Sequence, residues 1–434
     1  MSEKINLLIF KRDLRIEDNR TLRKCFEESE KFIPVFIFNP EIFESKNDVR
    51  LSFIAEAIRR IREKMKVYVF LGTDQEILEK ILQKYRISKV FTSLPLTISG
   101  KNRNNKIKEL LDRRGVDFVE VFDNVLCDFR KLPYKKVYTH FYNEWKENLD
   151  LYIGKDYEYN LKVVEDEEFD NLTQKVLDRF LINRITKWSY DFGFRRLEEY
   201  DFSKYSELRN DLGEDYSSKL SPYIRFGIIS IRKIYSVSFD KSESFVKELA
   251  WREFWYHISY NFPEIRQTEF QENKRSIAWE NNEDFMEAFF EARTGYPIID
   301  AAIVQLKQEN WMHNRARLIV GSFLTKDLLV NWRIGEKFFS EHLLDYDESI
   351  NIGNWQWIAS VGPDPKPIRI FNPIIQAQKF DPHANYIKKY LPELSKIEPH
   401  KLHDPIKYSI PYYTPIVIHS ERIEKIKRAY GIGV

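Results

Sequence analysis

Short apolar runs alternate with amphipathic segments over residues 5–124. Apolar runs of this length are typical of buried strands, and the amphipathic segments between them are typical of helices. Such alternation predicts right-handed βαβ units and a parallel sheet that is covered on both faces. The expected strands are Ile5–Phe10, Phe32–Asn39, Val67–Gly72, Lys89–Leu94 and Asp117–Asn124.

The pattern changes after residue 130. Residues 131–172 are rich in Tyr and acidic side chains and show little periodicity, which predicts a connector between domains. From Thr173 onward long amphipathic segments predominate, with Pro and Gly mostly at their ends, so this part should be almost entirely helical. We therefore expect an α/β domain over residues 1–130, with a Rossmann-like, five-stranded parallel sheet, and a larger all-α domain over residues 173–434.

The turn after the first expected strand bears on cofactor binding. It runs from Lys11 to Asp18 and contains no glycine, whereas a dinucleotide fingerprint needs glycines to bring the backbone close to a pyrophosphate. We therefore expect the main cofactor to bind elsewhere in the chain.

Composition narrows the class of protein. Aromatic residues make up 15% of the 434 residues, including nine Trp, which suits a protein that binds flat ligands. The formal net charge is only +2, so any contact with nucleic acid must use a local basic surface. The two cysteines, Cys25 and Cys127, lack the spacing of a metal site or a disulfide framework. No apolar run reaches the roughly 18 residues of a membrane span. These features predict a cytoplasmic protein without a metal site or a membrane segment.

Residues 345–357 combine polar and aromatic groups unusually densely. They hold Asp345, Asp347, an isolated amide at Asn351, and the two indoles of Trp355 and Trp357. In a helix the two indoles are about 200° apart around the axis, so one can face the interior while the other lines a cavity. The hydroxyl-rich segment 217–221 precedes Pro222, and it could open a helix whose free N–H groups bind a diphosphate.

Seven motifs in this order resemble the photolyase/cryptochrome family, specifically its class that repairs cyclobutane pyrimidine dimers in DNA. The resemblance covers nearly the whole chain. The motifs are Phe10–Arg15, Glu248–Phe254, Arg293–Asp300, Trp311–Arg317, Asp327–Trp332, Asp345–Trp357 and Arg369–Pro373.

The resemblance implies one reduced FAD per chain, bound in the helical domain. Asn351 matches the family position next to flavin N5, where photosensors often have Asp or Cys, and its neutral amide points to the reduced flavin used for repair. The matching FAD residues are Tyr205, Ser217, Ser218, Lys219, Leu220, Ser221, Arg252, Asn314, Arg317, Asp345, Asp347 and Asn351.

The resemblance also implies contacts with UV-damaged DNA. Trp251 and Trp357 would stack on a flipped dimer, and Glu248 and Asn314 would hydrogen-bond or line its pocket. Six-four photoproduct enzymes usually carry a second His where Asn314 stands, and Leu318 replaces a Met of many dimer-repair relatives. Electrons would reach oxidised flavin through Trp355, Trp332 and Trp279, and phosphates could be bound by Arg225, Lys366, Arg369 and Lys379.

A second, light-harvesting chromophore is expected in the N-terminal domain. Residues 99–106, Ser-Gly-Lys-Asn-Arg-Asn-Asn-Lys, occupy the loop after the fourth expected strand, where folate-using relatives have an acid. Cations and amides there favour a phosphate-bearing flavin or deazaflavin over folate. An empty groove with a solvated basic loop is the alternative.

Three functions remain open from the sequence. The first is light-dependent dimer repair by a monomer in which photoexcited reduced FAD donates an electron. The second is a cryptochrome-type photosensor, although the chain ends at Val434 without the long tail of many sensors. The third is a thermal flavin oxidoreductase, for which no nicotinamide fingerprint is present.

Overall fold

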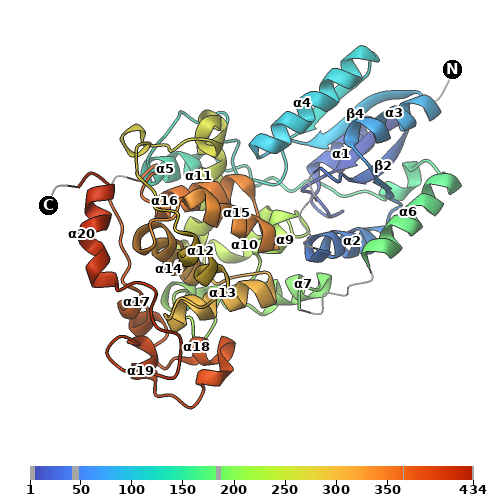
Figure 1. Cartoon of the computed structure of the whole chain (residues 1–434). Coiled ribbons are helices and arrows are strands. Elements are labelled where there is room, and N and C mark those ends of the chain that lie inside the picture. The colour runs from blue at the N-terminus through green and yellow to red at the C-terminus, as the bar shows by residue number, and fades with distance from the viewer. Residues whose placement is uncertain (1–4, 42–47, 182–186, 365, 433–434) are drawn as a thin grey trace. The chain divides into compact units, whose positions relative to one another are not determined.

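The computed structural model describes residues 5–41, 48–181, 187–364 and 366–432, and Figure 1 shows its secondary structure. The chain forms two compact units. The first comprises Met1–Pro133, Tyr142–Tyr200 and Ser218–Tyr260, and the second comprises Tyr134–Phe141, Asp201–Ser217 and Asn261–Val434. These units divide the chain differently from the expected domains, because the segments Tyr142–Tyr200 and Ser218–Tyr260 belong to the unit that holds the sheet. The functional division into domains stays a prediction.

The first unit contains a five-stranded, wholly parallel sheet, as expected. Its strand order β3-β2-β1-β4-β5 places β1 at the centre, where Leu7, Leu8 and Ile9 are fully buried. The strands are β1 (Ile5–Phe10), β2 (Lys31–Phe38), β3 (Tyr68–Leu71), β4 (Ile87–Ser93) and β5 (Asp117–Val121).

The other elements of this unit are helices. They are α1 (Arg20–Glu27), α2 (Asp48–Arg62), α3 (Asp74–Lys84), α4 (Ile98–Arg113), α6 (Glu167–Phe180), α7 (Tyr190–Glu199), α9 (Ser221–Arg225), α10 (Ile231–Ser238), α11 (Glu243–Asn261) and the single turn η1 (Tyr159–Lys162). Helix α5 (Tyr138–Glu147) begins in the second unit and ends in the first.

The second unit is helical. Helix α13 packs against α14 and α18, and α15 packs against α16. Its helices are α8 (Tyr205–Leu208), α12 (Glu283–Phe290), α13 (Pro297–Glu309), α14 (Asn314–Ser322), the π-helical turn η5 (Phe323–Asp327), α15 (Trp332–His342), α16 (Glu348–Ile358), α17 (Pro373–Phe380), α18 (Asn385–Tyr390), α19 (Pro399–His403) and α20 (His419–Ala429), with the short turns η2 (Phe202–Lys204), η3 (Pro263–Arg266), η4 (Glu272–Lys274) and η6 (Pro392–Leu394). Among the described residues, no helix combines the length and the apolar character that crossing a bilayer requires.

Two segments that were expected to be irregular are helical. Asp166 caps α6 by accepting the N–H of Phe169 at 3.1 Å, so the expected boundary at residue 172 falls inside this helix. Helix α6 lies along the edge strand, where the hydroxyl of Thr173 accepts the Val69 N–H at 2.8 Å. The hydroxyl thereby satisfies a donor of an edge strand that would otherwise need another partner.

Residues 99–106 form the first half of α4 and not a loop. The loop was expected from the correspondence with folate-using relatives, and the Gly and Asn residues here also have low helix propensity. The helix begins because Thr97 caps it, accepting the Gly100 N–H at 3.2 Å. Ile107 and Leu111 then bury its apolar side in the sheet core, and tertiary packing overrides the local propensity.

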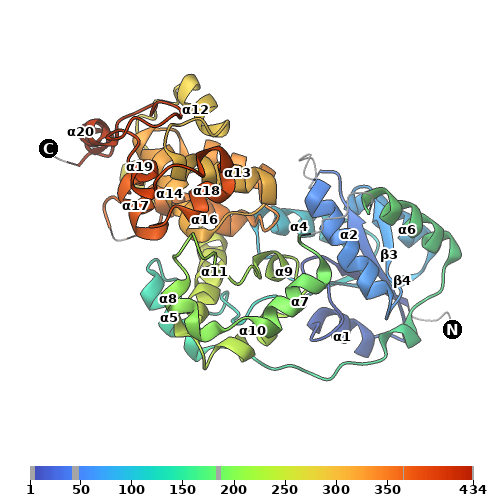
Figure 2. The ribbon, with the colours of Figure 1, turned by 90° about the horizontal axis from the view of Figure 1, so that it is seen from below.

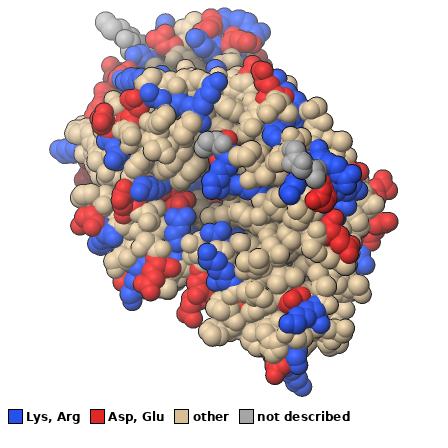
Figure 3. Space-filling model, turned by 90° about the vertical axis from the view of Figure 1, so that its left-hand side faces the viewer, with Lys and Arg blue, Asp and Glu red and all other residues tan. Residues whose placement is uncertain are grey.

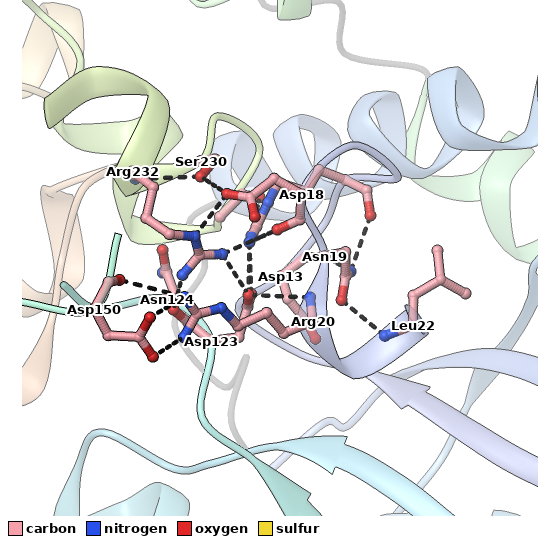
Figure 4. A network of polar contacts seen from close by, with 12 residues as sticks. Asp13, Asp18, Asn19, Arg20, Leu22, Asp123, Asn124, Asp150, Ser230 and Arg232 are labelled. Carbon is pink, nitrogen blue, oxygen red and sulfur yellow. Dashed lines mark hydrogen bonds and ion pairs between the residues drawn. The ribbon is translucent and has the colours of Figure 1, made fainter. Parts of the chain in front are cut away.

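A buried network of charges joins α10 to the ends of β1 and β5 (Figure 4). The Arg232 guanidinium donates to Asp18 Oδ2 at 2.7 Å and to Asp123 Oδ1 at 2.9 Å. Arg15 pairs with the same Asp123 at 2.7 Å, and the Ser230 hydroxyl donates to Asp18. Burial opposes ionisation of Asp123, but the two guanidinium groups outweigh it and lower its pKa. The turn after β1 therefore uses its polar groups to bind helices of its own unit.

The same turn also touches the end of α9. The Leu14 N–H donates to the Phe226 carbonyl at 3.1 Å. Gly227, which follows Phe226, has a φ of +66°. A Cβ at Gly227 would lie 2.0 Å from the Arg12 carbonyl oxygen, so only glycine allows this approach. Helix α7 lies beside α9, since the Tyr223 hydroxyl donates to the Ser189 carbonyl at 2.7 Å (Figure 2). Helices α7, α9 and α10 are thus integral to the first unit.

Candidate functional site

Helix α16 places the two indoles of residues 345–357 as the sequence predicts. Asp347 caps the helix, accepting the Ile350 N–H at 3.3 Å. Trp355 is 3% exposed and packs edge-on against Phe339 at a centroid distance of 4.9 Å. Trp357, on the other side of α16, is half-buried, and the Arg369 guanidinium lies 4.2 Å from its ring centroid. One indole is thus buried and the other is partly exposed, while a cavity beside Trp357 stays a prediction.

Helix α14 supports the polar residues before α16. His313 caps this helix, and Asn314 and Arg317 follow on its first turns, with Asn314 exposed. Arg317 donates to both oxygens of Asp345, at 2.8 and 3.1 Å, and its Nε donates to the Met312 carbonyl at 2.9 Å. Both bonds to the carboxylate come from Nη2, and this charge-assisted contact holds Asp345 beside α14.

Asn351 has a partner that the sequence did not reveal. Its Nδ2 donates to Glu336 Oε1 at 3.0 Å and to the Glu336 carbonyl at 3.2 Å, so its Oδ1 is left to accept from another donor. Tyr346 donates to the same Glu336 oxygen at 3.2 Å. Burial raises the pKa of Glu336, while its hydrogen bonds to Asn351 and Tyr346 oppose the rise. Glu336 lies in an ordinary amphipathic helix, and no local signal marks it.

The three expected relay tryptophans lie on adjoining elements of the second unit. Trp332 begins α15, is buried, and donates its indole N–H to Glu269 at 3.1 Å. Two hydrogen bonds join the segment just after Trp279 to the segment just before Trp332, from Glu280 N–H to the Leu329 carbonyl and from Asn331 N–H to Asn281 Oδ1, both 2.8 Å.

The same helix α15 brings Trp332 and Trp355 onto packed elements. Gly335 allows α16 to approach, because a Cβ there would lie 2.2 Å from Cη2 of Trp355. The elements that carry these three tryptophans are therefore in contact in series. Helix α16, with Trp355, packs against α15, and the start of α15, with Trp332, is bonded to the segment that follows Trp279.

The remaining expected FAD residues of the second unit lie before α9. Tyr205 begins α8, with the Arg209 guanidinium 5.3 Å from its ring centroid, and the Ser217 N–H donates to the Asp215 carbonyl at 2.9 Å.

The first unit carries the other expected cofactor residues, Ser218–Ser221 and Arg252. Ser218 and Lys219 lead directly into α9, which begins at Ser221, so the expected helix start is present. Lys219 has a left-handed φ of 55°, which few side chains adopt without a specific need. Leu220 is fully buried and anchors the turn.

Arg252 on α11 is buried but incompletely bonded. One terminal nitrogen, Nη1, donates to the Asn124 carbonyl at 3.1 Å, and the guanidinium lies 4.9 Å from the Tyr256 ring centroid. The other, Nη2, is buried and has no hydrogen-bond partner among the described residues. A buried guanidinium N–H without a partner is rare, and an anion such as a phosphate would satisfy it. The site therefore fits the diphosphate of FAD.

Helix α11 also carries the expected dimer-binding residues. Trp251 is half-buried beside Trp255, with ring centroids 5.7 Å apart, and Glu248 lies one turn earlier. The helix is fixed by Glu253, whose carboxylate accepts the N–H groups of Leu126 at 2.6 Å and of Trp145 at 2.8 Å. Burial raises the pKa of Glu253 to about 7. Glu253 belongs to the motif Glu248–Phe254, but its anchoring role depends on distant partners.

Known protein families and individual proteins resemble this chain. Residues 6–159 match the family described as DNA photolyase, and residues 245–431 match the FAD binding domain of DNA photolyase. A deoxyribodipyrimidine photo-lyase of Alkalihalophilus pseudofirmus is 32% identical, and the alignment covers 98% of this chain and 97% of that protein.

The chain belongs to the DNA photolyase family. It is an enzyme of the photo-lyase class, with an FAD-binding domain and a role in DNA repair.

Two solved structures resemble this photolyase over nearly its whole length. The archaeal photolyase from Sulfolobus tokodaii, which was crystallised with two FAD molecules, superposes with a TM-score of 0.89 at 32% identity, covering 98% of this chain and 99% of its own. The cryptochrome of Synechocystis sp. PCC6803 superposes with a TM-score of 0.84 at 22% identity, covering 99% of this chain and 100% of its own. The second likeness shows the shared fold alone.

Proposed function

We propose that this photolyase repairs cyclobutane pyrimidine dimers in UV-damaged DNA by light-driven electron transfer from one reduced FAD per chain. The observation that carries the proposal is on α11, where the incompletely bonded Arg252 lies one turn from Glu248 and next to Trp251. One helix therefore bears both a candidate phosphate ligand and candidate dimer contacts. When bound, reduced FAD would supply the electron that splits the dimer and would take it back.

The protein groups have separate roles in this proposal. The resemblance to the family implies that Arg252 and the hydroxyls of Ser217, Ser218 and Ser221 bind the diphosphate. It also implies FAD contacts for Tyr205, Asn314, Arg317, Asp345 and Asp347. Asn351 presents its Oδ1 beside the flavin ring, because Glu336 holds its amide nitrogen. Glu248 donates or accepts hydrogen bonds at the pyrimidine edges, and Trp251 and Trp357 stack on the bases.

DNA would be attracted by a local group of basic side chains and not by the overall charge of the protein. Lys and Arg side chains are interspersed with Asp and Glu on the face drawn in Figure 3, in keeping with the formal net charge of +2. Among the expected phosphate ligands, Arg369 pairs with Asp364 at 2.5 Å while its guanidinium covers Trp357. We infer that Arg369 shields the Trp357 ring until a base replaces it. The proposal assumes a monomer, as expected from the sequence.

Illumination of the reduced protein with DNA that contains a dimer tests this function. Restored monomeric pyrimidines in the light, and none in the dark, are expected. Binding of the DNA without repair would instead favour the photosensor function, and reduction of a dissolved substrate in the dark would favour a thermal oxidoreductase.

Trp357→Ala should weaken binding of dimer-containing DNA by about 1–3 kcal/mol, or roughly 5-fold to 150-fold in Kd, since one stacking surface is lost. Fluorescence anisotropy with a labelled oligonucleotide measures the change. Trp357→Phe is the matched control, because it keeps an aromatic face and should lose much less. Equal affinities for the wild type and the Ala variant would remove Trp357 from the DNA site.

Trp332→Phe should slow photoreduction of oxidised FAD by at least about 10-fold, because phenylalanine is much harder to oxidise than an indole. Repair by enzyme that was chemically reduced beforehand should remain near the wild-type rate, since that reaction does not use the relay. Flash photolysis and the repair assay measure the two rates separately. A parallel loss of both activities would contradict the relay role of Trp332.

We also propose a flavin-type antenna chromophore in the N-terminal domain, with its phosphate near the end of β1 and the start of α4. Lys11 there contacts Asp74 at 2.5 Å, and burial lowers the pKa of Lys11 to about 8. Asn39 donates to the same Asp74 at 2.9 Å, and Arg103 lies on α4. The two FAD molecules in the Sulfolobus tokodaii structure support the proposal. Extraction of the pigments from protein produced with ample flavin should yield a second flavin, whereas a folate or a single FAD would contradict it.

A further inference from the structure

A cavity of about 610 Å³ lies within the first unit. Its walls are the turn after β1, the C-terminal end of α2, Ile153 and Asp156, helix α7, and helix α10 with the residues just before it. None of the residues proposed above for FAD, DNA or the antenna lines it. The volume falls in the range of about 300–1,000 Å³ that small-molecule sites have, so the cavity can hold a ligand of nucleotide size.

Two helices each turn one regular side toward this cavity. Helix α7, which lies between α2 and α10 (Figure 2), contributes Tyr190, Phe194 and Glu198 at intervals of four residues. Helix α10 contributes Lys233 and Ser236, three residues apart. Side chains at these intervals share one face of a helix. The walls are therefore held by regular helices, which position side chains more precisely than loops do.

Most charged side chains in the walls already have partners. Lys64 lies 3.4 Å from Glu17, and Arg60 pairs with Asp191 at 2.5 Å. The other lining carboxylates that accept hydrogen bonds from neighbours are those of Asp18, Glu63 and Asp156. These groups hold the walls together and have little charge left to offer a ligand.

Three charged side chains of the walls are left over. Arg195 on α7 and Lys233 on α10 are exposed, and the side chain of neither makes an ion pair or a hydrogen bond with a described residue. Glu198, one turn after Arg195, is likewise unpaired in the described part of the chain. Two cations and one carboxylate suit a ligand that carries both an anionic group and hydrogen-bond donors.

Two buried atoms of the walls also lack partners. Nε of Arg15 and Oδ1 of Asp18 have no hydrogen-bond partner among the described residues, although Arg15 is only 3% and Asp18 only 5% exposed. Buried donors and acceptors are nearly always bonded in proteins. Both residues line the cavity, so a polar ligand, or water that it orders, supplies the missing partners.

The cavity also has an aromatic side. The rings of Tyr190 and Phe194 are tilted by 38° with centroids 4.9 Å apart, and both residues are half-buried. The Arg60 guanidinium lies 5.8 Å from the Tyr190 ring centroid, so it already occupies a face of that ring. Phe194 is therefore the better surface for a flat ligand ring, and aromatic faces of this kind bind nucleobases.

We propose that this cavity binds a mononucleotide. Arg195 and Lys233 bind the phosphate, for which a guanidinium fork and an ammonium group are common ligands. Glu198 accepts hydrogen bonds from the ribose hydroxyls, as acidic residues do in dinucleotide sites, and the base lies against Phe194. The ligand joins α7 to α10 and to the turn after β1. This site uses neither FAD nor DNA, so the inference does not depend on the proposed function.

Isothermal titration calorimetry with AMP tests the proposal. Protein that contains FAD is used in the dark, so that the flavin site is occupied, and one AMP per chain is expected to bind. Arg195→Gln and Lys233→Gln should each weaken binding by about 10-fold to 150-fold, the loss of one hydrogen bond to a charged group. No binding to the wild type, or equal affinities in the wild type and both variants, would overturn the proposal.

Arg196→Gln is the matched control. Arg196 follows Arg195 on α7, but it does not line the cavity, and its guanidinium lies 4.7 Å from the Tyr200 ring centroid. The variant removes the same charge and should keep the wild-type affinity, whereas an equal loss would show that the overall charge of α7 and not the cavity binds AMP. Inorganic phosphate and adenosine should each bind much more weakly than AMP. Phosphate that binds as tightly as AMP would rule out a mononucleotide site.

Photo-crosslinking with 8-azido-AMP locates the bound nucleotide. The label is expected on a peptide from α7, because the base lies against Phe194. An excess of AMP should abolish the label, and DNA that contains a dimer should not. A label on the peptide that holds Asn314, or competition by the DNA, would place the nucleotide in the proposed dimer site and overturn the inference while leaving the proposed function intact.

Discussion

Arg232→Met is expected to lower the free energy of unfolding by about 3–5 kcal/mol, because it leaves two buried carboxylates without their partner. Arg232 is fully buried and bonds the side chains of Asp18 and Asp123 together with the Asp123 carbonyl, at 2.9 Å. Methionine can fill much of the volume but can donate no hydrogen bond. Urea denaturation followed by circular dichroism measures the change in unfolding free energy.

Arg59→Met is the matched control for this experiment. Arg59 pairs with Glu56 at 2.7 Å on the surface of α2, and its side chain is 43% exposed. An exposed pair contributes only about 0–1 kcal/mol, because water and salt screen it. The large effect of Arg232→Met is thus expected to come from burial and not from loss of a positive charge. Similar losses in the two variants would contradict a stabilising role for the buried network.

Arg252→Leu is expected to weaken FAD binding by about 2–5 kcal/mol, or roughly 30-fold to 4,000-fold in Kd, the range for truncation of one partner of a buried charge pair. The buried Nη2 has no protein partner among the described residues, so a ligand phosphate is the partner that the variant would lose. Titration of flavin-free protein with FAD, followed by quenching of flavin fluorescence, measures the affinity.

Arg252→Lys is the control variant for the guanidinium. It keeps the positive charge but loses the planar fork, so it should bind FAD more weakly than the wild type and more tightly than Arg252→Leu. Arg252 also donates to the Asn124 carbonyl, so both variants are first checked by circular dichroism to be folded at the temperature of the titration. Wild-type affinity in folded Arg252→Leu would exclude Arg252 from the FAD site.

The contrast between α4 and α16 shows which local features a sequence can predict. Periodicity located all five strands, because buried parallel strands are continuous apolar runs, and it placed Trp355 and Trp357 on opposite sides of α16. The loop expected at residues 99–106 came from the resemblance and is wrong, because the packing of Ile107 and Leu111 in the sheet core outweighs the low helix propensity of Gly and Asn. Local patterns therefore predict an element well when burial and propensity agree.

The sequence by itself predicted the parallel sheet and the family, and both predictions are confirmed, because apolar periodicity and motif spacing are local properties of the chain. The FAD and DNA residues that the motifs point to stay predictions. Only the tertiary structure showed the partners of those residues. Glu336 holds Asn351, Glu253 anchors α11 to Leu126, and Lys326 lies at the hydroxyl of Tyr430, 104 residues away. Such groups look like ordinary helix residues in the sequence. Their charge states and hydrogen bonds arise from burial against distant segments, and burial is decided only when those segments pack together.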